Sequence, residues 1–135
     1  MGYLLDTDAT VHLRDGDPIV RSLLSKLEEV PAISVVTRVE LEGGVYARPE
    51  LSAKRRRAID ALLKECTVHD FTNEIAVAYS EIVAQTGFSR RKMADRMIAA
   101  TALVHGLTLV TLNVRDFRDV PNLELLEWTR PDSEA

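Results

Sequence analysis

The sequence lacks several features, and each absence excludes a class of protein. With a single cysteine, Cys66, the chain cannot form an internal disulfide, which argues against a small secreted domain held together by disulfides. No run approaches the roughly 18 apolar residues that a membrane-spanning helix needs. The N-terminus MGYLLDTD has no basic region leading into a long apolar stretch, as a secretion signal would. We therefore expect a cytoplasmic protein with no membrane partner.

What remains is the composition of an ordinary globular protein. The chain has 135 residues, of which 46% are hydrophobic and 28% charged, enough for one real core but not for two. We predict a single domain over residues 1–129 and a disordered tail over residues 130–135.

Basic residues gather in two short segments despite a net charge of −4, which by itself disfavours an anionic partner. The first segment is residues 54–57 and the second is residues 90–92. Either could be a solvated helix face or helix start. Both are also candidates for contacts with the phosphates of a nucleic acid, and their residues are Lys54, Arg55, Arg56, Arg57, Arg90, Arg91 and Lys92.

Short apolar runs alternate with helical patterns along the chain. Strands are predicted at residues 3–5, 32–36, 68–71, 107–111 and 123–126. Helices are predicted at residues 17–27, 37–42, 53–64, 73–86 and 94–104, with residues 6–16 as a link and the pair Gly43-Gly44 ending the second helix. Such alternation is typical of an α/β domain whose short parallel sheet, here of four to five strands, is covered by helices on both faces.

Four acidic residues are predicted to meet at the carboxyl edge of that sheet, where α/β proteins bind their ligands. Asp6 follows the first strand, Glu40 lies in the first turn of the next helix, and Asp116 follows the strand at residues 107–111. Asp95 begins a helix that runs back to that strand, so it reaches the same edge. Carboxylates gathered in a cleft repel one another unless a cation binds them, and an all-oxygen set suits Mg²⁺ or Mn²⁺.

Each acid also has a purely structural explanation. Thr37 and Glu40 have the spacing of a capping box, and Asp95 could cap a helix or favour its dipole. Asp116 could lie in a turn, and Asp8 is better explained as a cap than as a ligand. Asp6 is harder to explain in this way, because an acid at the end of a buried strand needs a partner.

The acids lie in four segments that together resemble a PIN domain, and more narrowly the VapC-type ribonuclease toxins of toxin–antitoxin pairs. The segments are LLDTD at residues 4–8, VVTRVELEGG at 35–44, MADRMIAATALVHG at 93–106 and TLNVRDF at 111–117. The resemblance implies a PIN-like three-layer α/β/α domain. It also implies that Asp6, Glu40, Asp95 and Asp116 are catalytic and hold the metal, and that Thr7, Thr111 and Asn113 orient these carboxylates or the attacking water.

By this resemblance the protein is a Mg²⁺- or Mn²⁺-dependent endoribonuclease, the toxin of a type II toxin–antitoxin system. It would hydrolyse RNA phosphodiester bonds with a metal-activated water. A homodimer is expected, together with a VapB-type antitoxin that covers the active site in a hetero-oligomer. The RNA-binding candidates are then the basic side chains already named.

Two other functions stay open. Residues 6–10, Asp-Thr-Asp-Ala-Thr, fit the opening motif of haloacid-dehalogenase-like phosphatases, with Asp6 as the nucleophile. The Ser/Thr and Lys pair and the double aspartate that such an enzyme needs are not found. A non-catalytic binding module with the same fold is the other alternative.

Overall fold

Five parallel strands form the centre of the computed structural model, which describes residues 2–129. They are β1 (Tyr3–Leu5), β2 (Ala32–Ser34), β3 (Val68–His69), β4 (Thr108–Thr111) and β5 (Leu125–Glu127), in the spatial order β3-β2-β1-β4-β5. The strands are β-branched and leucine-rich, as buried parallel strands usually are. The predicted parallel sheet is confirmed, with five strands.

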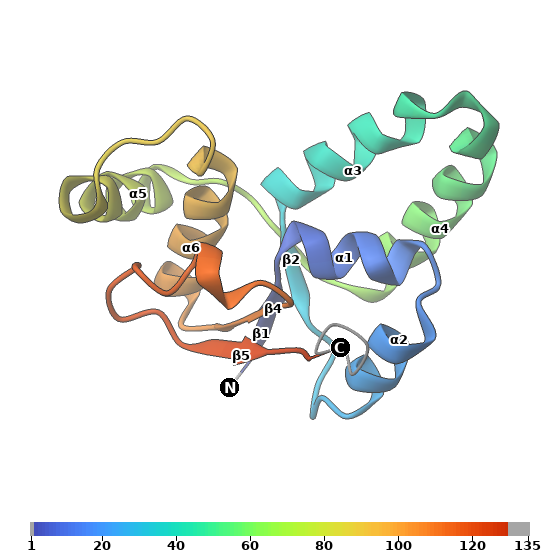
Figure 1. Cartoon of the computed structure of the whole chain (residues 1–135), viewed down its shortest axis with the longest axis horizontal. Helices are drawn as coiled ribbons and strands as arrows, with labels where there is room; N and C mark the ends of the chain where they lie inside the picture. The colour runs from blue at the N-terminus through green and yellow to red at the C-terminus, as the bar shows by residue number, and fades with distance from the viewer. Residues whose placement is uncertain (1, 130–135) are drawn as a thin grey trace.

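Six helices surround the sheet. They are α1 (Thr7–Arg14), α2 (Pro18–Ser25), α3 (Val35–Ala47), α4 (Ser52–Glu65), α5 (Asn73–Thr86) and α6 (Met93–His105), with short 3-10 turns η1 (Pro49–Leu51) and η2 (Val114–Asp116). Figure 1 places α5 and α6 on one side of the sheet and α1 and α2 on the other. The expected three-layer α/β/α arrangement is confirmed.

Alternate strand residues pack into different cores. Leu4 and Leu109 belong to the core that contains α5 and α6, whereas Leu5, Ile33 and Val110 belong to the core that contains α1 and α2. This division follows from the two-residue period of a strand, which sends successive side chains to opposite faces. The sheet is therefore covered on both faces.

Helix α1 corrects the prediction that residues 6–16 form a link. It begins directly after β1, and Asp6 caps it by accepting a hydrogen bond from the Ala9 amide at 2.9 Å. Ala9 and Thr10 are fully buried. With few apolar residues the segment has little helical pattern of its own, so the cap and the packing against the sheet determine its helix.

Helix α3 corrects the prediction that the two glycines end a helix. It runs through Gly43 and Gly44 to Ala47, because Leu41 and Val45 on either side are buried against α4. A Cβ at Gly44 would lie 3.0 Å from the Arg14 guanidinium. The glycine therefore allows a close approach of neighbouring helices, and packing outweighs a cost of about 1 kcal/mol per helical glycine.

Helices α3 and α4 form a hairpin that projects from the rest of the molecule (Figure 1). Its own small core consists of Leu41, Val45 and Ile59, with Leu62 and Val11 of α1 packed against it. The predicted amphipathic helix at residues 53–64 is thus confirmed as α4.

The remaining predictions concern the ends of elements and of the chain. Pro18 opens α2 after the Asp17 cap, and Gly87 and Gly106 end α5 and α6 as expected. The tail predicted over residues 130–135 lies outside the described residues. Within residues 2–129, no helix combines the length and apolar character needed to cross a membrane.

Candidate active site

The four acids predicted from the sequence come from four separate elements around the carboxyl edge of the sheet. Asp6 joins β1 to α1, Glu40 lies on α3, Asp95 lies in the first turn of α6, and Asp116 ends η2 after β4. We call these four residues the carboxylate cluster.

Asp6 is the most constrained member of the carboxylate cluster. Its side chain is buried, and its Oδ2 accepts a 2.6 Å hydrogen bond from the Thr111 hydroxyl, while Oδ1 caps α1. The Thr111 hydroxyl in turn accepts from the Asn113 amide at 2.9 Å. Burial, together with the charges of Asp8 and Asp95, raises the pKa of Asp6 to about 6 despite these hydrogen bonds.

Glu40 is held by the residue that follows Asp6. The Thr7 hydroxyl donates a 2.6 Å hydrogen bond to Glu40 Oε1 and lies 3.0 Å from the Thr37 hydroxyl. Since Thr7 has one hydroxyl proton, Thr37 donates to Thr7 in this chain of contacts. The contacts join α1 to α3 across the edge of the sheet.

The capping-box explanation of Glu40 is wrong. Helix α3 begins two residues before Thr37, with Ser34 as its cap, and the Ser34 hydroxyl accepts from the Val36 amide at 3.0 Å. Glu40 therefore lies in the second turn, past the position that a capping box requires.

Asp95 interacts electrostatically with each of the other three acids. Burial and the charges of Asp116 and Glu40 raise the pKa of Asp95 to about 6, and Lys92 and Arg91 oppose this rise. Asp95 is not the cap of α6, because the cap position belongs to Lys92. A location in the first turn still lets it interact with the helix dipole.

Asp116 is held by Asn113, whose side-chain amide donates a 2.7 Å hydrogen bond to Asp116 Oδ2. Buried Phe117 and Val120 follow on the chain and fix η2 to the core. Thr7, Thr111 and Asn113 thus each donate to a different carboxylate of the cluster.

The donor set of the cluster fits a hard divalent cation. Its atoms are carboxylate oxygens, and two of the acids have pKa values raised by burial and by like charges, a condition that a bound cation relieves. As the side chains stand, no three His, Cys, Asp or Glu residues within 2–129 are grouped closely enough to hold a metal ion. Glu40 is exposed and Asp116 is half-buried, and hydrogen bonds from Thr7 and Asn113 orient their carboxylates.

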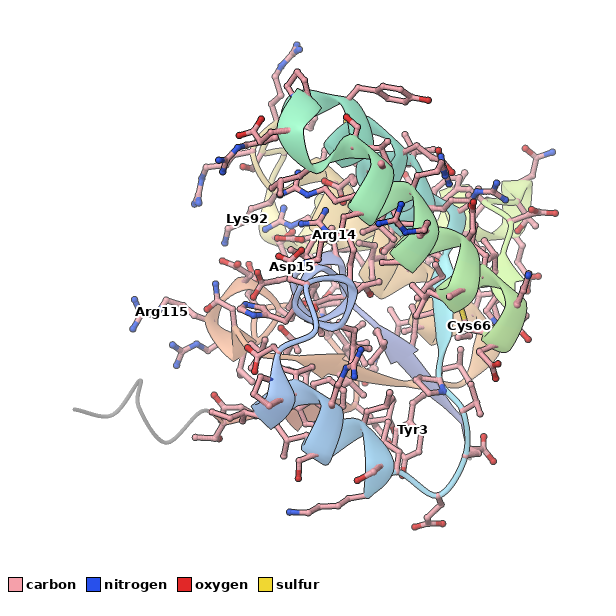
Figure 2. The ribbon with its side chains drawn as sticks, turned by 90° about the vertical axis from the view of Figure 1, so that its right-hand side faces the viewer. Tyr3, Arg14, Asp15, Cys66, Lys92 and Arg115 are labelled. Atoms are coloured by element: carbon pink, nitrogen blue, oxygen red, sulfur yellow. The ribbon has the colours of Figure 1, made fainter. Side chains whose placement is uncertain are left out.

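The two basic segments differ in their surroundings. On α4, Arg55 donates to the Gly44 carbonyl at 2.8 Å and Arg56 pairs with Glu42 at 2.6 Å and with Asp60 at 2.9 Å. In the segment before α6, the positive charges of Lys92 and Arg91 lower the pKa of Asp95 and so partly offset its rise. Figure 2 shows Lys92 and Arg115 on one side of the molecule and Cys66 on the opposite side.

One cavity is lined by none of the four acids of the carboxylate cluster. It is an apolar groove of about 630 Å³ whose walls include Leu13, Leu24 and Leu62, from α1, α2 and α4, with Cys66 among its lining residues. Arg14 and Arg21 also line this groove, as do Glu28, Glu29 and Glu65. The groove is a separate surface from the acids at the sheet edge.

Three residues near the carboxylate cluster were not identified from the sequence as part of the site. Thr37 was considered only as a cap, and Arg96 and Asp119 were not considered, although they form an ion pair at 3.1 Å. Arg96 gave a signal that could have been used, because it is one of few polar residues in an almost entirely apolar helix. Asp119 gave none.

Comparisons with known proteins identify the family and the fold. Residues 3–123 match the family described as the PIN domain. Ribonuclease VapC2 of Rickettsia felis is 28% identical over 138 residues, covering 96% of this chain and 100% of the relative. Ribonuclease VapC10 of Mycobacterium tuberculosis is 35% identical over 118 residues, covering 84% of each protein. A chain in the crystal structure of VapBC2 from Rickettsia felis, bound to a promoter DNA fragment, matches with a TM-score of 0.82 and 27% identity, covering 95% of this chain and 99% of that chain.

Proposed function

This chain belongs to the PIN domain family and has VapC ribonucleases among its relatives, and from that premise we propose that it is a divalent-metal-dependent endoribonuclease, the toxin of a toxin–antitoxin pair. The family match agrees with the resemblance drawn from the four sequence segments. The observation that carries the proposal is the carboxylate cluster, whose four acids come from separate elements around one edge of the sheet, with Asp95 interacting electrostatically with the other three. Helix capping alone does not explain such an arrangement.

Asp6, Asp95 and Asp116 would hold one or two Mg²⁺ or Mn²⁺ ions, with Glu40 as a direct or water-mediated ligand. When bound, the metal supplies a water of lowered pKa and stabilises negative charge on the phosphate. The protein side chains keep the ligands in place. Thr111 orients Asp6, Asn113 orients Asp116 and Thr7 orients Glu40, since each donates to one oxygen of its carboxylate.

Glu40 has a further role in this proposal. Its Oε1 accepts from Thr7, and its side chain is exposed at the rim of the cluster. We propose that its Oε2 acts as a general base, which accepts a proton from the water that attacks the phosphorus of the phosphodiester bond. A fixed carboxylate at the rim can take this proton without leaving its hydrogen bond to Thr7.

RNA is the proposed substrate, and the basic segment at residues 90–92 is the proposed contact for its phosphates. The positive charges of Arg91 and Lys92 act on Asp95, so a phosphate bound by this segment would be within electrostatic reach of the carboxylate cluster. Arg57 and Lys54 of α4 remain candidates, whereas Arg55 and Arg56 have partners within the α3–α4 hairpin.

A VapB-type antitoxin is the proposed partner, because the structural relatives include a VapBC complex. We propose that it covers the carboxylate cluster and assembles with a homodimer of this chain. Measuring the mass of the protein alone, and then with the antitoxin, by light scattering tests both statements. A monomer in the first measurement would contradict the homodimer.

The decisive experiment is cleavage of total cellular RNA by the purified protein with Mn²⁺ or Mg²⁺, beside a chelator control. Asp95→Asn and Glu40→Gln should each lower the cleavage rate by about a hundredfold or more, because each removes a charge that the reaction requires. Glu81→Gln is the matched control, since Glu81 is an exposed acid on α5 and has no assigned role. It should cleave as the unmodified protein does.

The outcome also separates the alternatives. Hydrolysis of a small phosphate ester through an aspartyl-phosphate on Asp6, without RNA cleavage, would identify a phosphatase instead. Metal binding without turnover of RNA would identify a binding module. Cleavage that persists in EDTA would contradict the metal-dependent nuclease.

A further inference from the structure

Arg96 is a charged residue inside the core of the molecule. Its side chain is 3% exposed, and it lies on α6 directly after Asp95, with Ile98 and Ala99 beyond it fully buried. Successive helix residues point about 100° apart. Asp95 therefore faces the carboxylate cluster while Arg96 points elsewhere, into the protein.

The guanidinium of Arg96 joins two segments that border the cluster. One terminal nitrogen donates to the Gly87 carbonyl, and the other pairs with Asp119 Oδ2 at 3.1 Å. Gly87 precedes the basic segment at residues 90–92, and Asp119 lies three residues after Asp116. One side chain thus connects the proposed phosphate contact, the helix of Asp95 and the turn of Asp116.

Lys92 takes part in the same connection. Its ammonium lies 4.0 Å from Asp119 Oδ2, and its charge also acts on Asp95. Asp119 therefore attracts two cations, one buried and one at the rim. The position of Lys92 relative to Asp95 depends on a carboxylate that Arg96 holds.

Stability alone does not account for this arrangement. Within the described part of the chain, Arg96 Nε is buried and has no hydrogen-bond partner. Leaving a buried donor unpaired is unfavourable, and a buried ion pair often contributes less to stability than apolar residues of the same size would. Phe117 and Val120 already anchor the turn that Asp119 belongs to.

We propose that Arg96 is a positioning residue, which fixes the spacing of Asp95 and Asp116 and the placement of residues 90–92 by binding Gly87 and Asp119 at once. The inference rests on the proposed metal-dependent function. A lysine at this position would keep the positive charge but lacks the two separate terminal nitrogens with which Arg96 reaches Gly87 and Asp119.

The test uses Arg96→Lys, Asp119→Asn and, as a matched control, Arg56→Lys, which changes an arginine of α4 whose ion-pair partners are Glu42 and Asp60. Mn²⁺ binding to the RNA-free protein is measured by calorimetry, and hydrogen exchange is followed along the chain. We expect both test variants to bind Mn²⁺ about tenfold more weakly, as when other residues that orient metal ligands are removed. Exchange should rise at residues 87–92 and 113–119 together.

The control should bind Mn²⁺ as the unmodified protein does. If Arg96→Lys does not fold, Asp119→Asn decides alone, because Asp119 is 41% exposed and its replacement leaves the core packing intact. Unchanged Mn²⁺ affinity in a folded test variant would overturn the inference while leaving the proposed function standing. If the unmodified protein binds no Mn²⁺, the metal-dependent function fails and the inference fails with it.

Discussion

The two basic segments of the chain have similar composition but different partners. In the segment at residues 54–57, Arg55 and Arg56 have partners inside the α3–α4 hairpin, where the Arg56 guanidinium lowers the pKa of Glu42. The segment at residues 90–92 instead acts on Asp95 at the sheet edge. A run of basic residues therefore does not reveal whether its charge is available to a ligand. Whether that charge is available depends on which carboxylates the fold places near the basic side chains.

Removing charge from each segment in turn tests the difference most directly. The double variant Arg90→Ala and Arg91→Ala should weaken binding of RNA, measured by fluorescence anisotropy in EDTA, by about tenfold at low salt. The slope of log affinity against log salt concentration should become shallower by about 1.4, or ~0.7 for each phosphate that the variant no longer neutralises.

The matched control is Arg55→Ala with Arg56→Ala, which removes the same charge from α4. These arginines are bound to Gly44 and Glu42, so RNA affinity should change much less. Equal weakening in the two double variants, or an unchanged salt slope in the first, would break the comparison.

The second prediction concerns Asp95, on which the charges of the basic segment at residues 90–92 act. The pKa of Asp95 is raised to about 6, so its charged form is disfavoured in the folded state. The protein therefore loses stability as the pH rises from about 4 to 6, and the full penalty is present above that range. In EDTA at pH 7.5, Asp95→Asn should be more stable than the unmodified protein by about 1 kcal/mol, less than the full shift implies because solvent screens a half-buried carboxylate.

Thermal unfolding at pH 4 and pH 7.5 checks this expectation. The advantage of Asp95→Asn should vanish at pH 4 and should reverse at pH 7.5 when Mn²⁺ is added, since metal stabilises only the protein that binds it. An Asp95→Asn protein that is less stable in EDTA at both pH values would contradict the raised pKa.

The smallest expected effect is on the stability of the hairpin. Arg56→Ala removes the pairs with Glu42 and Asp60, so the melting temperature should fall slightly at low salt. The difference should shrink in high salt, because exposed ion pairs are screened. Arg90→Ala, at an exposed position of the second basic segment with no role in the hairpin, should melt as the unmodified protein does. A larger fall for Arg90→Ala than for Arg56→Ala would reverse the comparison.

Much of this arrangement could be predicted from the sequence, because strands and acids follow local patterns. Asp6 comes directly after an apolar run, and a parallel sheet brings such positions to one edge. Helix α1 was missed because Asp6, Thr7 and Asp8 have the composition of a link. The course of α3 through Gly43 and Gly44 depends on contacts with α4, which local propensity does not contain.

The contacts around the cluster were predictable to different degrees. Thr7, Thr111 and Asn113 were named from the family resemblance, and each donates to one of the four acids. Their roles in catalysis stay a prediction. The pair of Arg96 and Asp119 spans 23 residues and joins a helix to a turn, so no local pattern could reveal it.

Asp6 links the formation of the fold to its chemistry. The same carboxylate closes the first turn of α1 and accepts from Thr111 at the far end of the chain, so folding cannot finish without assembling a central part of the reaction site. Selections for chains that are no longer toxic would therefore return two kinds of survivor. Changes at Glu40 would leave a folded protein still able to bind the proposed antitoxin, whereas changes at Asp6 to residues that cannot cap a helix would also lower the amount of protein in the cell.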